Sequence, residues 1–402
     1  MKLLWAGSDF LHPATRGGQI RTLEMLRQLH KRHEIHYAAL ADPDRPEGVA
    51  RAGEYSSRAF PFAFRPARKT SPRFALEAAA ATFSPLPLAA GRWRCAEMRT
   101  ALERLIREER YDAMVCDFLV TAVNFPRLER AVLFQHNVES VIWQRRRENA
   151  GDPLRRLYMR LQERRMRDFE AAACRRAARV VAVSEKDAAT IREWFGVPCS
   201  YVPTGIDTAY FARPADTAKG QGLVFAGSMD WAPNIDGITW FAEEVLPLIR
   251  ARNQELPVTI VGRMPPAGIQ ALAARDRFVH VTGTVPDVRP YLWNASVAMV
   301  PLRIGGGTRL KIYEAMAAGI PVVATTIGAE GLDVSDGETI ALADTPLDFA
   351  RCCLDLCGDT AARARLATAA REMVASRYSW EQVAREFEPF LVQAPEAAAG
   401  NP

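Results

Sequence analysis

Residues 305–323 combine glycines and charged side chains at spacings that suit the binding of an anion. Three glycines precede a predicted helix that starts near Thr308, and Arg309 and Lys311 fall in its first turn. Glycines at a helix start let a ligand approach bare backbone N–H groups, and the helix dipole favours negative charge there. Glu314, one turn further on, is placed to reach a sugar hydroxyl. The stretch predicts a phosphate-bearing ligand; the alternative is an ordinary crossover helix with a solvated arginine and lysine.

Apolar runs on both sides of this stretch indicate the elements that position it. Residues 297–302 read as a buried strand before the glycines, and residues 321–324 as the strand after the helix. Gly319 suits the turn that ends the helix, and Pro321 cannot continue it. The order is strand, glycine loop, helix, strand. In open α/β sheets, ligands bind beyond the carboxyl ends of the strands.

The same alternation runs through most of the chain and predicts an α/β fold with two Rossmann-like halves. The first half has predicted strands at residues 2–7, 34–40, 113–116, 131–134, 179–183 and 200–202. The second half has them at 223–226, 257–261, 278–281, 297–301 and 321–324. Residues 41–93 interrupt the rhythm with proline, arginine, phenylalanine and alanine, and we expect loops and short helices there.

The length of 402 residues favours two domains over one. We expect an N-terminal domain over residues 1–205 and a C-terminal domain over 206–378. Residues 379–402 are expected to form a helix, packing back on the N-terminal domain, and a flexible tail. The two halves differ in charge. Up to Gly205 there are 35 lysines and arginines against 24 acidic residues, or +11; from Ile206 the counts are 17 against 23, or −6. Such a difference suggests different partners.

Other features of composition narrow the class of protein. The N-terminus enters a predicted strand at once, which differs from a signal peptide, and no apolar run reaches eighteen residues. Seven scattered cysteines, an odd number, argue against a disulfide framework. Cys352, Cys353 and Cys357 have no histidine nearby and are expected to be core thiols rather than a metal site. These features predict a cytoplasmic protein.

Four segments, taken in order, resemble glycosyltransferase family 4. They are residues 184–185 (Ser-Glu before a helix), 203–207 (Pro-Thr-Gly-Ile-Asp), 225–231 (Phe-Ala-Gly-Ser-Met-Asp-Trp) and 305–323. The resemblance covers nearly the whole chain and is most specific from Lys311 to Val323. It implies the GT-B fold, in which two Rossmann-like domains face a cleft.

The resemblance also implies a reaction, in which a sugar moves from a nucleotide diphosphate to an acceptor with retention of configuration. It implies that Glu314 binds the donor ribose and that Arg309 and Lys311 hold the diphosphate. Gly306, Gly307 and Thr308 would line the same donor site. The physics agrees, because negative charge grows on a leaving diphosphate and preorganised cations stabilise it. The donor would be a co-substrate, and no cofactor or metal is expected.

The sequence departs from the family pattern at two places. Many relatives carry two glutamates eight positions apart, but the residue eight positions before Glu314 is Gly306. Many relatives also have Gly-Arg where this chain has Gly227-Ser228, with a lysine near the position of Asn234. We expect Arg309 and Lys311 to supply the missing positive charge. Ser228 remains a donor-site candidate.

Three further loops are site candidates. Gly17-Gly18 follows the first predicted strand, and the resemblance implies that it meets the donor diphosphate; the alternative is a plain strand–helix turn. Gly328-Ala329 follows the strand after the central helix and could offer backbone N–H groups, or be only a turn. His136 follows a predicted strand end, so a catalytic or sugar-contacting role competes with a role in satisfying loop backbone.

Asp117 is a weaker candidate of the same kind as His136, since it also follows a strand. The Asp42-Pro43-Asp44 segment looks like a metal-binding Asp-x-Asp, but its proline suits a turn, so no metal role is expected.

A run of arginines from Arg145 to Arg179 is interleaved with leucine, methionine and phenylalanine. Arginine can bury its stem and keep its charged head in water. The run favours an amphipathic surface for an anionic membrane or a lipid-linked acceptor. The alternative is a solvated helix that packs its leucines into the core. Nucleic acid is a poorer partner, because no aromatic array or known motif accompanies the charge.

The sequence therefore predicts a glycosyltransferase of the hexosyltransferase type, acting in polysaccharide or cell-envelope glycan synthesis. Its C-terminal domain would bind the nucleotide sugar and its basic N-terminal domain a glycan or lipid-linked acceptor. The location would be cytoplasmic, peripheral on the inner face of the membrane. Two alternatives are a nucleotide-sugar epimerase on the same fold and an inactive GT-B-like binding protein.

Overall fold

A computed structural model describes residues 1–14, 17–67, 71–81, 84–148, 152–215, 217, 220–304 and 309–391. The chain divides into two compact units. Unit 1 is Met1–Pro203 together with the chain from Val383 onward, and unit 2 is Thr204–Gln382. The chain thus leaves the first unit once and returns to it near its end.

Unit 1 is built on a seven-stranded sheet in which every neighbouring pair is parallel. The strands are β1 (Lys2–Gly7), β2 (Glu34–Ala41), β3 (Arg58–Ala63), β4 (Ala113–Asp117), β5 (Val132–Gln135), β6 (Arg179–Ala182) and β7 (Ser200–Tyr201). Their order in the sheet is β3-β2-β1-β4-β5-β6-β7. The order reverses direction between β1 and β4, which is where such sheets place ligands.

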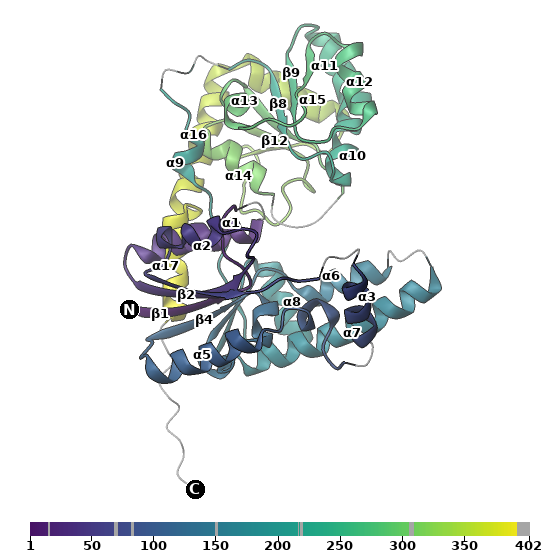
Figure 1. The fold of residues 1–402 in the computed structure, drawn as a ribbon. Coiled ribbons are helices and arrows are strands. Elements are labelled where there is room, and N and C mark those ends of the chain that lie inside the picture. Colours follow the sequence, from purple (N-terminus) through teal and green to yellow (C-terminus); the bar gives the residue numbers. More distant parts are fainter. Residues whose placement is uncertain are drawn as a thin grey trace. The chain divides into compact units, whose positions relative to one another are not determined.

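Helices cover both faces of this sheet. They are α1 (Gly17–His30), α2 (Glu47–Ala50), α3 (Pro72–Ala81), α4 (Leu88–Gly91), α5 (Ala96–Glu108), α6 (Glu139–Glu148), α7 (Pro153–Arg176), α8 (Glu185–Phe195) and α17 (Trp380–Leu391). Figure 1 shows α1 on one face and α5, α7 and α8 on the other. Because both faces are buried, the central strands read as continuous apolar runs.

Strand β1 shows how this packing arises from alternation. Leu4 and Ala6 belong to the core cluster that also contains side chains of α5, α7 and α8. Trp5 points to the opposite face, where its ring lies 6.4 Å from Phe134 and 5.6 Å from Phe387 of α17. The returning C-terminal segment therefore completes the core on that side of unit 1.

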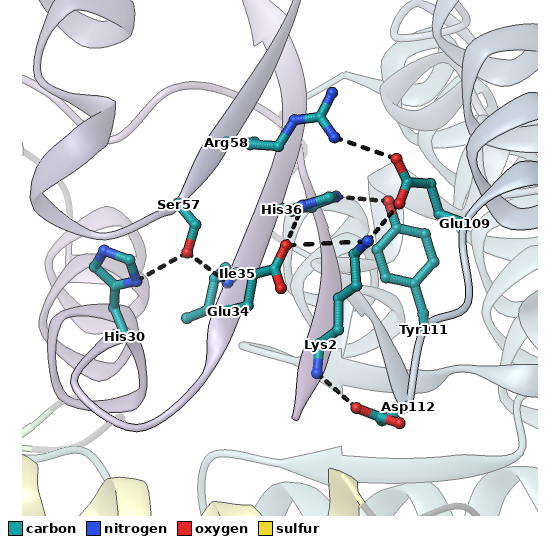
Figure 2. Close-up of polar contacts among 10 residues, drawn as sticks. All are labelled: Lys2, His30, Glu34, Ile35, His36, Ser57, Arg58, Glu109, Tyr111 and Asp112. Atoms are coloured by element: carbon teal, nitrogen blue, oxygen red, sulfur yellow. Dashed lines mark hydrogen bonds and ion pairs between the residues drawn. The ribbon is translucent and has the colours of Figure 1, made fainter.

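A polar network closes the amino ends of the first strands. Its members are Lys2, His30, Glu34, Ile35, His36, Ser57, Arg58, Glu109, Tyr111 and Asp112 (Figure 2). The fully buried ring of His36 lies 2.8 Å from the Tyr111 hydroxyl and 3.0 Å from a Glu34 carboxylate oxygen. Lys2 pairs with Glu109 across the same edge. These groups lie at the edge opposite to the carboxyl ends of the strands, so we infer that they stabilise the fold rather than bind a ligand.

Unit 2 contains a six-stranded, all-parallel sheet in the order β10-β9-β8-β11-β12-β13. The strands are β8 (Leu223–Ala226), β9 (Val258–Val261), β10 (Val279–Val281), β11 (Val297–Val300), β12 (Val322–Ala324) and β13 (Ala341–Leu342). Its helices are α9 (Thr208–Phe211), α10 (Ala232–Trp240), α11 (Leu246–Arg252), α12 (Ala267–Arg275), α13 (Arg289–Trp293), α14 (Leu310–Ala317), α15 (Pro346–Gly358) and α16 (Thr360–Arg377). The switch in strand order falls between β8 and β11.

The predicted fold class, α/β with parallel sheets, is confirmed in both units. The prediction for residues 41–93 was incomplete, because β3 lies there and pairs in register with β2. Its sequence, Arg-Ala-Phe-Pro-Phe-Ala, lacks the apolar run of a central strand and contains Pro61. Proline is tolerated at a sheet edge, which is the place that β3 occupies.

Candidate functional site

In unit 2 a lysine from α14 reaches the end of β8. The ammonium of Lys311 donates to the side-chain oxygen of Asn234 at 2.8 Å. The amide nitrogen of Asn234 in turn donates to the backbone carbonyl of Ser228 at 2.6 Å. Two segments that are distant in sequence, residues 228–234 and the start of α14, therefore meet at the carboxyl end of the sheet, where α/β folds bind ligands.

Gly227 makes this approach possible. A side-chain carbon at this position would lie 2.5 Å from Nζ of Lys311 and 2.9 Å from the amide nitrogen of Asn234. The ammonium also lies 4.4 Å from the centre of the Phe225 ring, a cation–π contact. A side chain at residue 227 would therefore displace the ammonium of Lys311 from this position.

Burial makes the charge of Lys311 costly. It lowers the pKa of the ammonium to about 7, with Glu314 raising the value and Arg309 lowering it further. Burial also raises the pKa of the Glu314 carboxyl, which Lys311 opposes. A bound anion would stabilise the charged ammonium of Lys311, which burial has separated from water.

Arg309 is brought to the same place. It is buried, it precedes the first turn of α14, and its guanidinium lies 5.4 Å from the centre of the Trp231 ring. Burial lowers its pKa, and Glu330 in the loop after β12 raises it. The structure thus places Arg309 and Lys311 at the start of α14, beside the loop of residues 227–231, with Glu314 one turn further along the helix.

The remaining donor-site candidates in unit 2 are residues 306–308, which precede α14 in the sequence, and Gly328-Ala329 in the loop after β12. Gly306, Gly307 and Thr308 lie outside the described residues. The backbone amide of Gly328 donates to the Thr325 hydroxyl at 2.9 Å, and that of Ala329 to the Thr325 carbonyl at 3.0 Å. A ligand that used either N–H group would have to replace one of these bonds, so a role for this loop stays a prediction.

Arg263 was not predicted as a site residue from the sequence. It follows β9, its Nε donates to the Ser228 hydroxyl at 2.8 Å, and its terminal nitrogen lies 2.9 Å from a carboxylate oxygen of Asp230. A signal was present, since Gly262-Arg263 follows its strand just as Gly227-Ser228 follows β8. Only the register of the two strands shows that these pairs meet.

In unit 1 the Gly17-Gly18 pair opens α1 beneath an aromatic stack. A side-chain carbon at Gly18 would lie 2.5 Å from the tip of the Phe118 ring. That ring stacks on His136 with centroids 3.8 Å apart. Phe118 adopts a positive φ of 66°, a strained region for a bulky residue. Gly18 therefore leaves room for the ring that covers His136.

Both nitrogens of the buried His136 ring are engaged. Nε2 lies 2.6 Å from a carboxylate oxygen of Asp117, and Nδ1 lies 3.3 Å from a guanidinium nitrogen of Arg21. Because arginine can only donate, Nδ1 must accept and Nε2 must carry the proton. Burial lowers the pKa of the imidazole, Asp117 raises it and Arg21 lowers it, in keeping with a neutral ring. The predicted sugar contact would require one of these bonds to be exchanged, and it stays a prediction.

Asp117 is the centre of this buried cluster. Its second oxygen accepts from the Thr22 hydroxyl at 2.7 Å and from the Trp5 indole at 3.2 Å. The buried Arg21 guanidinium has its pKa lowered to about 10 by desolvation, which the charge of Asp117 opposes. Arg21 and Thr22 were not predicted, because their helix pattern alone gives no sign that they point at a strand end.

The basic run maps to α6 and α7, and the first turns of α7 lie in solvent. Leu154 is 81% exposed and Leu157 is 66% exposed, between exposed arginines at 155, 156 and 160. Further along the helix Met166 is buried in the core. The alternative in which the leucines of this run pack into the core is thus wrong for Leu154 and Leu157.

Two kinds of feature are absent from the described ranges. They contain no group of three or more histidine, cysteine or acidic side chains placed to hold a metal ion. No helix among the described residues is long and apolar enough to cross a bilayer.

Sequence profiles of two families match the chain. The profile for Glycosyltransferase Family 4 matches residues 15–210, and the one for Glycosyl transferases group 1 matches residues 220–359. An uncharacterized 44.6 kDa protein in the cps region of Klebsiella pneumoniae is 24% identical over 137 residues, 32% of this chain and 35% of that protein. D-inositol 3-phosphate glycosyltransferase from Paenarthrobacter aurescens (strain TC1) is 27% identical over 248 residues, 56% of this chain and 60% of that protein. The chain therefore matches only part of the length of these curated relatives.

Solved structures resemble the chain over almost its whole length. Sucrose-phosphate synthase from Thermosynechococcus elongatus has a TM-score of 0.64 and 17% identity, covering 97% of this chain and 98% of that one. The Anabaena protein HepE, solved in complex with UDP, has a TM-score of 0.63 and 15% identity, covering 97% of this chain and 99% of that one. At such identities the likeness shows the fold alone.

Proposed function

We propose, from the premise that this chain belongs to glycosyltransferase family 4, that it transfers a sugar from a nucleotide diphosphate to an acceptor. Its fold is the α/β fold of the GT-B class. The observation that carries the proposal is the arrangement at the start of α14, where Lys311 and Arg309 flank the loop after β8. Unit 2 would bind the donor, and the basic unit 1 a glycan or lipid-linked acceptor.

The chemistry follows from where charge develops. As the bond between sugar and diphosphate breaks, negative charge accumulates on the leaving phosphate oxygens. Lys311 and Arg309 stabilise that charge without having to reorganise, because Asn234 and Trp231 already hold them. Glu314 is proposed to accept hydrogen bonds from the donor ribose. We further propose, from the family resemblance, that the anomeric configuration is retained.

The first test is nucleotide binding. A thermal-shift screen of the full chain with UDP, GDP and ADP should show stabilisation by at least one of them, as expected for a ligand that binds only the folded state. The solved complex of HepE with UDP makes UDP the first choice. No stabilisation by any of the three would contradict the proposal. Labelled donor mixed with membrane extract should then place label in an acceptor, whereas an epimerase would release nucleotide without one.

The affinity for the diphosphate should fall as pH rises above neutrality. Lys311 has its pKa lowered to about 7 in the folded chain, and a bound phosphate favours its charged form, so binding takes up a proton above that pH. We expect UDP to bind roughly tenfold more weakly at pH 8.5 than at pH 6.5. Calorimetry of the wild-type protein and of Lys311→Met measures this. The same slope in both proteins would show that the titrating group lies elsewhere.

The stability of the ligand-free protein should change with pH in the opposite direction to its affinity for UDP. Between about pH 7 and the usual lysine value, the unfolded chain holds more protons than the folded one, so the ligand-free protein gains stability as pH rises through that window.

We propose that the first turns of α7, where Leu154 and Leu157 lie among arginines 155, 156 and 160, dock on an anionic membrane. We also propose that the enzyme acts at the inner face of the cell membrane, in exopolysaccharide or envelope glycan synthesis. Support comes from the exposed Leu154 and Leu157 among arginines, since apolar side chains insert while cations meet lipid phosphates.

The membrane proposal predicts a loss of vesicle binding in Leu154→Ser/Leu157→Ser. We expect at least about a tenfold weaker association with vesicles containing phosphatidylglycerol, because the variant no longer buries two apolar side chains. Sedimentation with vesicles measures this. Leu347→Ser is the control, since Leu347 is 65% exposed on α15 of unit 2. Equal binding by all three proteins, or equal binding to neutral vesicles, would contradict membrane docking by this surface.

A further inference from the structure

We infer that Arg263 is a third cation of the diphosphate site, delivered from the end of β9 to the residue that follows Gly227. The inference rests on the proposed function and deepens it. Position 228 carries a serine, where the family resemblance implies an arginine. The guanidinium is nonetheless present at this place, because Arg263 donates its Nε–H to the Ser228 hydroxyl at 2.8 Å.

The strand ends are built to bring Arg263 there. Strands β8 and β9 are parallel neighbours and run in register up to Ala226 and Val261. Just beyond, a side-chain carbon at Gly262 would lie 1.8 Å from the Gly227 carbonyl oxygen. The segments that follow β8 and β9 approach so closely only because residue 262 is glycine. The backbone N–H of Met229 then bonds the Arg263 carbonyl at 2.9 Å, which extends the pairing past the sheet.

Arg263 and Lys311 are joined through two intervening residues. The Ser228 hydroxyl accepts a hydrogen bond from Arg263, and the Ser228 carbonyl accepts one from the Asn234 amide. The side-chain oxygen of Asn234 in turn accepts one from Lys311. The loop of residues 227–231 is therefore flanked by cations from two sides, one beyond β9 and one on α14. One cation on each side of a strand end suits a ligand with two adjacent phosphates better than a ligand with a single charge.

Asp230 explains how the guanidinium is held when no anion is bound. It lies 2.9 Å from Arg263 and also accepts from the Ser228 hydroxyl. The hydroxyl and the guanidinium both hold the pKa of this carboxyl below its usual value. The Arg263 side chain is 62% exposed, so this pair adds little to folding and the guanidinium stays accessible to a phosphate. Asp230 is thus a positioning residue for Arg263.

The test compares a nucleoside diphosphate with its parent nucleoside. The probes are whichever of UDP, GDP and ADP binds the wild-type protein most tightly, and the corresponding nucleoside. We expect Arg263→Ala to weaken the diphosphate roughly tenfold and to leave the nucleoside unchanged, because only phosphates meet the guanidinium. Calorimetry measures both affinities. In turnover assays the variant should raise KM for the donor and lower kcat, since charge on the phosphates grows in the transition state.

A matched control is Arg377→Ala. Arg377 is also an arginine of unit 2, is likewise 62% exposed and pairs with Asp333 on the surface. It should bind both probes as the wild-type protein does. The exchange variant Ser228→Arg/Arg263→Ser returns the guanidinium to the same place from the other strand, and should recover the diphosphate affinity to within about threefold of wild type.

The outcomes separate the two proposals. If the wild-type protein binds none of the three diphosphates, the proposed function fails, and the inference about Arg263 fails with it. If it binds one and Arg263→Ala matches Arg377→Ala, the inference alone is overturned. An equal loss of nucleoside and diphosphate would also overturn it, since that pattern reports a disturbed fold or base site rather than a missing phosphate contact.

Discussion

Replacing both Arg309 and Lys311 by alanine is expected to lower sugar transfer by roughly 10³-fold or more, the largest effect on activity that we predict. Removal of a single preorganised hydrogen-bond donor from an oxyanion hole costs about 10²–10³-fold in rate, and we expect two cations at a leaving diphosphate to matter at least as much. The two cations lie at the same helix start, Arg309 against the Trp231 ring and Lys311 on Asn234, so the double variant removes both from one place.

The loss should appear in kcat as well as in donor affinity, because the diphosphate carries more charge in the transition state than in the bound donor. Initial rates at several donor concentrations separate the two. Arg275→Ala/Arg277→Ala is the control, because it also replaces two basic side chains by alanine, but at exposed positions near the amino end of β10. Near-normal turnover in the Arg309/Lys311 variant would show that the diphosphate is bound elsewhere.

The second large effect concerns stability. Asp117→Asn is expected to lower the free energy of unfolding by about 3 kcal/mol. The carboxylate accepts bonds from His136, Thr22 and Trp5, and its charge compensates the buried guanidinium of Arg21. An asparagine keeps the shape but loses the charge. Whichever way the amide is turned, its NH₂ group faces an N–H donor, either that of His136 or that of Trp5, and cannot accept the hydrogen bond that the carboxylate oxygen accepts.

Urea unfolding followed by tryptophan fluorescence measures this change, since Trp5 bonds the same carboxylate. Asp112→Asn provides a control at the other end of β4, because that exposed side chain accepts from the backbone N–H of Lys2 and an amide oxygen can do the same. Its effect should stay within about 0.5 kcal/mol. Equal midpoints for the two variants would show that the Asp117 cluster does not stabilise unit 1.

The sequence alone was sufficient for features that depend on neighbours along the chain. Residues 223–226 and 297–301 were predicted as strands because apolar runs between turn signals have few other solutions, and β8 and β11 lie there. Gly319 was predicted to end the central helix, and it adopts the positive φ of 72° that favours glycine. The proximity of Lys311 and Glu314 also followed from spacing, since residues three positions apart lie on the same face of a helix.

Pairings between distant segments were beyond the reach of the sequence. Nothing local to Arg263 shows that it meets Ser228, because that contact depends on the register of β8 and β9 and on two glycines that let the strand ends converge. The same holds for Arg21, which reaches His136 only because α1 packs over the ends of β4 and β5.

The sequence by itself thus determined the class of fold, the family and the helix start where Arg309 and Lys311 lie, since each depends on short-range pattern. The tertiary structure decided which charges act together: Lys311 with Asn234 and Ser228, and His136 locked between Asp117 and Arg21. The physical reason is that a parallel sheet brings the carboxyl ends of its strands to one edge, so residues far apart in the chain become neighbours only when it forms.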